Sequence, residues 1–269
     1  MENNKYQFIL NKVLRFALYI IGIMALTRIF VCDRFLIPSD SMAPCLNEGD
    51  IVYVNKLLCG PRIYKSLNFE RGNSLKSLRL LGIRKIRPND VICFNYPYGY
   101  DDNSKIEFRI NYVYCKRVLG TPGDRIGATD GHYWNDKYLK PIGYVKQQNN
   151  LRWTYDSIFL WNRAYYTIPL SSKKWNIKNW GPLIVPAKNL HVKLDDFTRE
   201  LYRQVIEYEM NSELDDSIEE YTFTQNYYFA VGDNVMESID SRYWGFIPED
   251  FIIGIVGGKK VRNNPYQTD

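Results

Sequence analysis

Histidine is almost absent from this sequence, which contains only His132 and His191 among its 269 residues. The five cysteines form no CxxC pair and have no metal-site spacing with either histidine. We therefore expect no metal ion and no cofactor. A histidine-based catalytic triad is also poorly supported, because neither histidine lies in a recognisable catalytic motif.

The small number of cysteines also limits disulfide bonding. They stand at positions 32, 45, 59, 93 and 115, and an odd number excludes complete pairing within one chain. For a chain exported from the cytoplasm, the sequence leaves one disulfide, two or none open.

A strong charge imbalance is lacking too, since the formal net charge is +5 and hydrophobic residues make up 45% of the chain. This composition is unlike that of a disordered chain or a nucleic-acid-binding protein, so we expect no nucleic-acid partner. The mild basic excess suits a protein beside an anionic membrane. The 22 tyrosines, with interspersed valine and isoleucine, favour strands over helices. We expect a mainly β body.

The apolar run near the amino terminus is short. Residues 16–27 carry no charge and follow Lys12 and Arg15, a pattern that indicates a cytoplasmic amino terminus. Twelve residues span only about 18 Å as a helix, whereas the hydrocarbon layer is about 30 Å thick. We therefore predict a transmembrane anchor over 13–31, with 1–12 in the cytoplasm. A cleaved signal peptide is the competing interpretation, and under both interpretations the chain after residue 31 is exported.

Short runs of alternating apolar and polar residues dominate the rest, and no internal repeat is visible. Strands are predicted over 50–55, 90–96 and 107–118. The basic segment 62–87 is typical of a solvated loop, with contact to lipid headgroups as the alternative. Asp195 is expected to cap a helix that has one apolar face.

Alternation along 107–118 separates two adjacent bases. Lys116 falls on the apolar face of the predicted strand and Arg117 on the polar face, as a solvent-side or paired charge. A lysine with an ordinary pKa near 10.4 is neutral in only about one molecule per few thousand at pH 7, but burial lowers that pKa. A buried Lys116 could then accept a proton from serine. The alternative is a strand-end lysine whose amine reaches water.

Two serines precede the strand predicted at 50–55. Ser39 and Ser41 lie two residues apart in a proline-containing turn, and loops tied to strands often hold reactive side chains. In isolation such serines are more often ordinary turn hydroxyls. Together with Lys116 they suggest a serine–lysine dyad, a known variant of nucleophile-plus-base catalysis.

Three segments, taken together, resemble the bacterial type I signal peptidase family. They are IPSDSMAPCLNEGDIVYVNK (37–56), CKRVLGTPGD (115–124) and VGDNVMESIDSRYWGFIPEDFIIG (231–254). RPNDVICFNYP at 87–97 resembles the family's intervening strand, and NWGPLIVPAKNL at 179–190 resembles its long-insert members. The segments occur in the family order.

The resemblance implies that Ser41 is the nucleophile and Lys116 the general base. It also implies an oxyanion hole made by the Ser41 amide and the Ser39 hydroxyl, with Ser238 orienting the lysine amine. A structural supporting role is implied for Asp233, Asp240 and Arg242. The residues that would bind substrate, or simply form core, are Ile37, Met42, Leu46, Tyr114 and Cys115.

Three positions depart from the family pattern. Val235 stands where arginine is usual, Cys45 where threonine is common and Asp40 where glycine is common. These differences bear on local geometry and substrate preference more than on the type of reaction.

By resemblance, the fold is a signal-peptidase-like β-sheet or barrel body with an inserted α+β subdomain and one N-terminal transmembrane helix. The catalytic core would comprise 32–124 and 226–269, with the insert at 125–225. The implied function is a membrane-bound endopeptidase that removes signal peptides from exported preproteins. Its partners would be those signal peptides and membrane lipid. The implied location is the bacterial cytoplasmic (inner) membrane, with a single span, the N-terminus inside and the catalytic domain on the periplasmic side.

Two other functions compete with this one. The first is a related serine–lysine peptidase that matures one dedicated secreted factor, or cleaves itself as repressor-type relatives do. The membrane segment argues against the repressor type, which would carry a DNA-binding module in its place. The second is a membrane-tethered binding protein with an inactive peptidase fold, which the joint presence of Ser39, Ser41, Lys116 and Ser238 disfavours. The sequence sets no oligomeric state.

Overall fold

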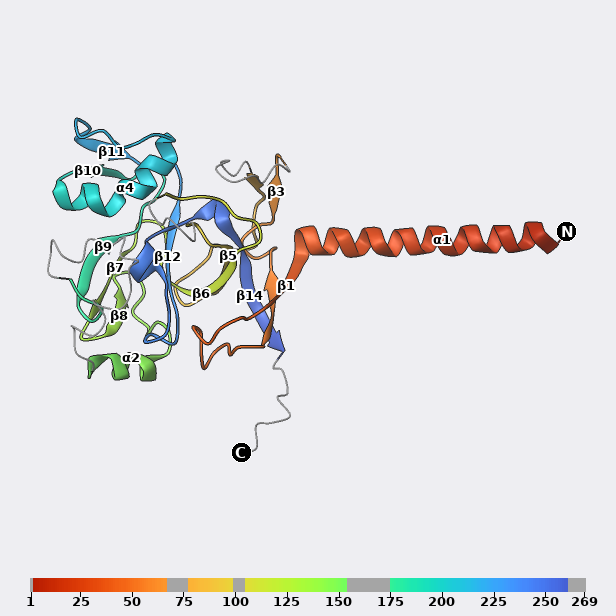
Figure 1. Ribbon diagram of the computed structural model, residues 1–269, viewed down its shortest axis with the longest axis horizontal. Coiled ribbons are helices and arrows are strands. Elements are labelled where there is room, and N and C mark those ends of the chain that lie inside the picture. Colours follow the sequence, from red (N-terminus) through yellow and green to blue (C-terminus); the bar gives the residue numbers. More distant parts are fainter. Residues whose placement is uncertain (1, 67–76, 99–104, 154–174, 261–269) are drawn as a thin grey trace.

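The computed structural model consists of one long helix and a mainly β body (Figure 1), and it describes residues 2–66, 77–98, 105–153 and 175–260. The helix α1 spans Glu2–Leu26 and continues as a π-helical turn, η1, over Thr27–Val31. It projects away from the body (Figure 1).

One segment of this helix is long and apolar enough to cross a membrane, judged by length and composition. It covers Tyr6–Val31 and has a mean hydropathy of 1.8. The helix begins well before the anchor predicted at 13–31, because Lys12 and Arg15 are good helix formers and do not interrupt it.

The body is built on a seven-stranded sheet with the order β1-β2-β14-β5-β6-β12-β13, and each neighbouring pair is antiparallel. The strands are β1 Cys32–Leu36, β2 Ile51–Asn55, β5 Val91–Asn95, β6 Val113–Gly120, β12 Tyr227–Val231, β13 Ile247–Pro248 and β14 Ile252–Lys260. The prediction of a mainly β body is confirmed. The strands predicted at 50–55 and 90–96 are confirmed as β2 and β5.

The strand predicted over 107–118 is wrong in its first half, since β6 begins only at Val113. The side-chain amide of Asn95 donates hydrogen bonds to the carbonyls of Arg109 (2.9 Å) and Ile110 (3.0 Å). These carbonyls are therefore bound by a side chain, and the Tyr112 amide closes a turn onto the Arg109 carbonyl. Beyond the turn, β6 pairs with β5 on one side and β12 on the other.

The described residues of the basic segment 62–87 include two paired antiparallel strands and are not simply a solvated loop, while residues 67–76 lie outside the described part. The strands are β3 Arg62–Tyr64 and β4 Ser77–Arg79. The Arg79 guanidinium points inward and donates to the backbone carbonyls of Gly60 (2.8 Å), Glu249 (2.7 Å) and Ile252 (2.6 Å). Hydrogen bonds to these backbone carbonyls thus hold Arg79 against the body. The charge pattern of the segment alone did not indicate this contact.

Between β6 and β12 in the sequence, the chain forms an α+β unit with a three-stranded sheet, β8-β7-β9, and a two-stranded sheet, β10-β11. Its elements are β7 Arg125–Thr129, β8 His132–Asn135, α2 Val145–Arg152, β9 Trp180–Ile184, β10 His191–Lys193, α4 Asp196–Met210 and β11 Glu220–Thr222. Asp195 caps α4 as predicted, and its carboxylate accepts from the Thr198 amide at 2.7 Å.

The α+β unit shares its core with the main sheet. One continuous cluster of buried side chains joins Ile92 and Val118 of the main sheet to Ile126, Leu183 and Leu201 of the unit. Because a single apolar core fills both parts, the unit packs as a layer of the body and braces the strand that carries Lys116.

Candidate active site

Ser41 lies in a turn that connects β1 to β2 and is half-buried. The turn is closed at its base by two backbone hydrogen bonds, from the Ile37 amide to the Asp50 carbonyl (2.8 Å) and from the Gly49 amide to the Ile37 carbonyl (2.9 Å). A small apolar core lies beneath the turn and comprises Ile37, Met42, Leu46, Val52, Val54, Cys93 and Ile253. Packing against this core holds the Ser41 turn on the sheet.

Lys116 reaches Ser41 from β6. Its Nζ lies 2.5 Å from Ser41 Oγ, and the lysine is only 4% exposed. The predicted alternation is confirmed, because Lys116 is buried and the next residue, Arg117, turns to the other side and forms an ion pair. A serine hydroxyl and a buried amine thus lie within hydrogen-bond distance, as a nucleophile and its base require.

The electrostatic setting favours the neutral form of this lysine. Burial lowers the pKa of Lys116 to about 8, while the Asp240 carboxylate opposes the shift and the Arg242 charge adds to it. At pH 7 about one amine in ten is then neutral, compared with about one in several thousand for an exposed lysine. The neutral amine can accept a hydrogen bond from the Ser41 hydroxyl.

The turn is also tied to the segment that follows β12. The Asn234 amide donates to the Ser41 carbonyl (3.2 Å), and its side-chain amide donates to the Asp40 carbonyl (3.2 Å). Ser39 is exposed and donates to Ser41 Oγ at 3.4 Å. Asn234 was not among the predicted site residues, although it stands within the third motif segment.

Ser238 is fully buried beside the same turn. A Cβ atom built on Gly232 would overlap both the Ser238 side chain and the Ser41 carbonyl. Gly232, Ser238 and Ser41 are therefore in close contact with one another. The Ser238 hydroxyl makes no hydrogen bond to Lys116 in the described part of the chain. The structure therefore brings Ser238 next to the dyad without a direct bond to the amine.

Asp240 and Arg242 form a buried ion pair behind the dyad. Two hydrogen bonds join their side chains, at 2.7 and 2.8 Å, and the Arg242 guanidinium also donates to the carbonyls of Val235 (3.1 Å) and Ser238 (3.3 Å). Burial would raise the pKa of Asp240, but the Arg242 charge and hydrogen bonds from Arg242 and the Gly232 amide outweigh it and hold that pKa below its ordinary value. The pair fixes the wall that faces Lys116.

Asp233 and Arg117 form a second pair, with hydrogen bonds of 2.7 and 2.6 Å. Arg117 also donates to Cys45 Sγ (3.3 Å) and to the Asn89 carbonyl (2.8 Å). This arginine therefore links β6, the Ser41 turn and the segment after β12. Cys45, at a position where the family commonly has threonine, acts here as the acceptor.

A groove of about 830 Å³ opens over the dyad. Of the residues predicted to contact substrate, four line it: Ile37, Met42, Tyr114 and Cys115. Leu46 is not among the residues that line this groove and is 2% exposed, packed in the core beneath the turn. Groove residues that the sequence analysis did not identify include Ile110, Glu237 and Ile239. Glu237 and Ile239 lie outside every predicted strand, and Ile110 lies in the part of 107–118 that precedes β6 and is not a strand.

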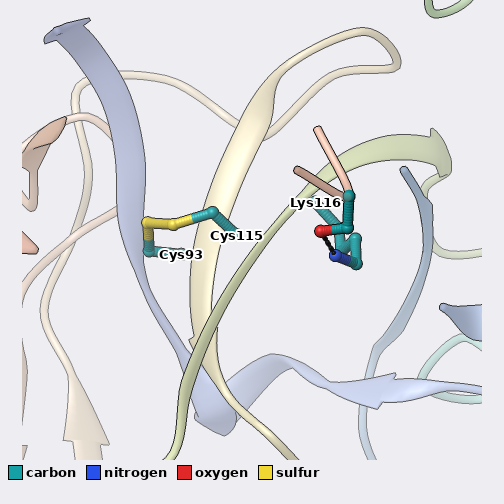
Figure 2. The surroundings of a disulfide bond; sticks show 4 residues. Cys93, Cys115 and Lys116 are labelled. Carbon is teal, nitrogen blue, oxygen red and sulfur yellow. Dashed lines mark hydrogen bonds between the residues drawn. A yellow bond between two sulfur atoms is a disulfide. The ribbon is translucent and has the colours of Figure 1, made fainter. Parts of the chain in front are cut away.

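Cys93 and Cys115 form a disulfide, one of the outcomes that the sequence left open. The two residues are direct register partners on β5 and β6. Figure 2 shows Cys115 and Lys116 pointing to opposite sides of β6. The disulfide therefore crosses the sheet one residue away from the candidate base. In the described residues, no cluster of three or more histidine, cysteine or acidic side chains could hold a metal ion.

Comparison with known proteins identifies one family. The model described as "Signal peptidase, peptidase S26" matches residues 10–258. The signal peptidase I of Buchnera aphidicola from Acyrthosiphon pisum is 30% identical over 84% of this chain and 67% of its own length. The signal peptidase I of B. aphidicola from Baizongia pistaciae is 27% identical over 88% of this chain and 72% of its own length.

Two further matches are more distant. The signal peptidase I of Pseudomonas aeruginosa is 26% identical over 90% of this chain and 66% of its own length. A crystal structure of a signal peptidase I from Enterococcus faecalis aligns with a TM-score of 0.31 and 18% identity, covering 65% of this chain and 99% of that one.

Proposed function

Because the chain belongs to the signal peptidase family, peptidase S26, and is thus a serine endopeptidase that removes signal peptides, we propose that Ser41 and Lys116 are its catalytic dyad. The observation that carries this proposal is the 2.5 Å distance between Lys116 Nζ and Ser41 Oγ in a buried site. A lowered lysine pKa accounts for how this amine acts as a base near neutral pH.

The reaction is an acyl transfer. Ser41 Oγ attacks the carbonyl before the cleavage site while Lys116 takes the hydroxyl proton, and the resulting ammonium returns that proton to the leaving amine of the mature protein. Lys116, neutral again, then activates a water molecule that releases the signal peptide from Ser41. Both half-reactions need the neutral amine at their start.

Two donors would stabilise the oxyanion that forms on the attacked carbonyl. They are the Ser41 amide and the Ser39 hydroxyl, which lies 3.4 Å from Ser41 Oγ and is free to reorient at the exposed edge of the turn. Each such donor contributes about 3 kcal/mol to transition-state stabilisation. Ser238, buried beside the Ser41 carbonyl, would orient the lysine amine during proton transfer.

The substrate would bind as an extended strand along β6. Main-chain hydrogen bonds to the segment before Lys116 would supply affinity, and alternate side chains would enter pockets of the groove. Ile37, Met42, Tyr114 and Cys115 line those pockets. Leu46 would act indirectly, as part of the core that supports Met42.

In this proposal α1 anchors the enzyme in the bacterial cytoplasmic membrane. The basic residues Lys12 and Arg15 place the N-terminus inside, so that the body faces the outer, periplasmic side. The catalytic core comprises 32–124 and 226–269 and the insert 125–225. The partners are signal peptides of exported preproteins and membrane lipid.

The test is cleavage of a preprotein with a small-x-small site by the full-length protein in several detergents and lipids. Ser41→Ala and Lys116→Ala should leave the preprotein intact, whereas Lys140→Ala, which changes an exposed lysine, should cleave it at the wild-type rate. Cleavage by either dyad variant, or no cleavage by the wild type in any condition, would contradict the proposal.

A further inference from the structure

One edge of β6 is open next to the dyad. On one side of this strand, β5 pairs with residues 113–117. On the other side, the pairing with β12 begins only at Arg117, which lies opposite Val231. Among the strands that the structure describes, none pairs with this second edge at residues 113–116. A substrate strand added to β6 would occupy the open edge.

The end of β12 also sets where that substrate strand must stop. Because Val231 takes the place beside Arg117, an added strand can follow β6 only as far as Lys116. In the proposed reaction the scissile carbonyl lies at Ser41, so the residues after it cannot continue along β6. They have to pass over the segment 232–240, which follows β12 directly.

The segment 232–240 presents two exposed side chains to the groove. The Asn234 amide donates to the Ser41 carbonyl (3.2 Å), and the Glu237 amide donates to the Asn234 carbonyl (3.1 Å). Glu237 thus lies one turn away from the residue that binds the backbone of the nucleophile. Glu237 is exposed, Ile239 is 40% exposed, and both line the groove. These two side chains border the path of the residues after the cleavage site.

Glu237 has the one unpaired carboxylate that lines the groove within the described ranges. The other acidic residue of the groove is Asp33, whose carboxylate lies 3.3 Å from Lys56 and 3.4 Å from Arg28. Among the described residues, no hydrogen bond or ion pair engages the Glu237 carboxylate. Charges placed at a binding surface set specificity, because they attract opposite charges and reject like ones.

We propose that Glu237 selects substrates by the charge of the first residues of the mature protein. Its carboxylate favours a lysine or arginine within the first three residues after the cleavage site and disfavours an aspartate or glutamate there. An extended chain advances about 3.3 Å per residue, so these three residues are the ones within about 10 Å of the dyad. This inference rests on the proposed cleavage by Ser41 and Lys116, and it adds a determinant of specificity beyond the scissile bond.

The expected preference is modest because Glu237 is exposed. Exposed pairs of opposite charges change an affinity or a rate roughly two- to fivefold, and salt screens the effect. Compared with a glutamine at the same substrate position, lysine should therefore raise kcat/KM roughly two- to fivefold. Aspartate should lower it by a similar factor.

The test is cleavage of a peptide series by the full-length enzyme in an uncharged detergent. The peptides share one signal sequence and carry lysine, glutamine or aspartate at the first, second or third position after the cleavage site. The wild type should prefer lysine at one or more of these positions, Glu237→Gln should show no preference, and Glu237→Lys should prefer aspartate. Both preferences should vanish in about 1 M salt, where charges act over only about 3 Å.

Two controls separate recognition by Glu237 from other effects of the charge change. Glu213→Lys makes the same change at an exposed glutamate outside the groove, and it should keep the wild-type order of substrates. The charges that act on the Lys116 amine are those of Asp240, Arg242 and Asp233. With the glutamine peptide, the pH midpoint of kcat/KM should therefore be the same in Glu237→Lys and the wild type.

The outcomes distinguish this inference from the proposed function. Equal kcat/KM for the three charges in the wild type would overturn the inference while cleavage itself supports the proposed function. The same order of substrates in Glu237→Lys and the wild type, or a displaced pH midpoint in Glu237→Lys, would also overturn the inference. A wild type that cleaves none of the peptides would refute the proposed function and the inference with it.

Discussion

Raising the pH from 6 to 10 should increase kcat/KM along a single rising limb with a midpoint near 8, the pKa to which burial lowers Lys116. The active form carries a neutral amine, so at pH 7 kcat/KM should be about a tenth of its plateau value. A lysine with an ordinary pKa of 10.5 would leave about one enzyme in 3000 active at pH 7. The lowered pKa of Lys116 thus provides a gain of roughly 300-fold in the neutral fraction, or about 3 kcal/mol.

The assay is initial-rate cleavage of a peptide that has no titratable group between pH 6 and 10, at substrate concentrations far below KM. These conditions report the ionisation of the free enzyme. Stability of the enzyme at each pH is checked by returning samples to pH 8 before measurement. A flat profile, a midpoint near 6.5 typical of histidine, or a midpoint near 10.5 would refute a buried lysine as the base.

Three other changes have defined outcomes. Lys116→Met should raise the free energy of unfolding by about 3 kcal/mol more at pH 7 than at pH 10.5, measured by urea denaturation. Below pH 8 the wild-type folded state must bury an ammonium, and this cost disappears as the pH rises to 10.5. An equal effect at both pH values would contradict the lowered pKa of Lys116. Gly232→Ala should lower kcat at least tenfold in steady-state assays and cost about 1–3 kcal/mol of stability, because the added Cβ would displace the Ser41 carbonyl. Wild-type kinetics would show that the contact between Gly232 and the Ser41 carbonyl does not position the turn. Replacing both Cys93 and Cys115 with alanine should cost about 3 kcal/mol in the same denaturation assay, from the 22-residue separation of the crosslink, and an unchanged midpoint would rule out a stabilising disulfide.

The parts of the fold that were predictable are those governed by local patterns. Alternation identified the strands at 50–55 and 90–96 and placed Lys116 on the buried face, because neighbouring strand positions face opposite sides. The cap at Asp195 was also predictable, since an aspartate before an apolar helical repeat satisfies the first free amides of a helix.

The remaining features depend on contacts between distant parts of the chain. The late start of β6 at Val113 depends on Asn95, whose side chain binds carbonyls of the preceding turn. The disulfide required the register of β5 against β6, which no spacing of Cys93 and Cys115 reveals. The inward direction of Arg79 depends on carbonyls that the C-terminal segment supplies. Local sequence carries little information about such partners.

Of the two dyad residues, one was predictable from a local pattern and the other was not. Strand alternation points to Lys116 from the residues alone, but the choice of Ser41 over Ser39 came from motif resemblance. The structure places the Lys116 amine in hydrogen-bond contact with Ser41 Oγ, and Ser39 reaches only the Ser41 hydroxyl, at 3.4 Å. The geometry therefore supplies a physical reason for choosing Ser41 as the nucleophile.

The most direct test of the dyad is to identify the residue that carries the acyl group during turnover. Full-length enzyme is mixed with excess preprotein, quenched in acid within one turnover, digested and analysed by mass spectrometry. We expect the mass of the signal-peptide fragment on the peptide that contains Ser41, assigned to that side chain by fragmentation, and no adduct in Ser41→Ala or Lys116→Ala. An adduct on Ser39 or on any other residue, or an adduct that persists in Ser41→Ala, would contradict the assignment of the nucleophile.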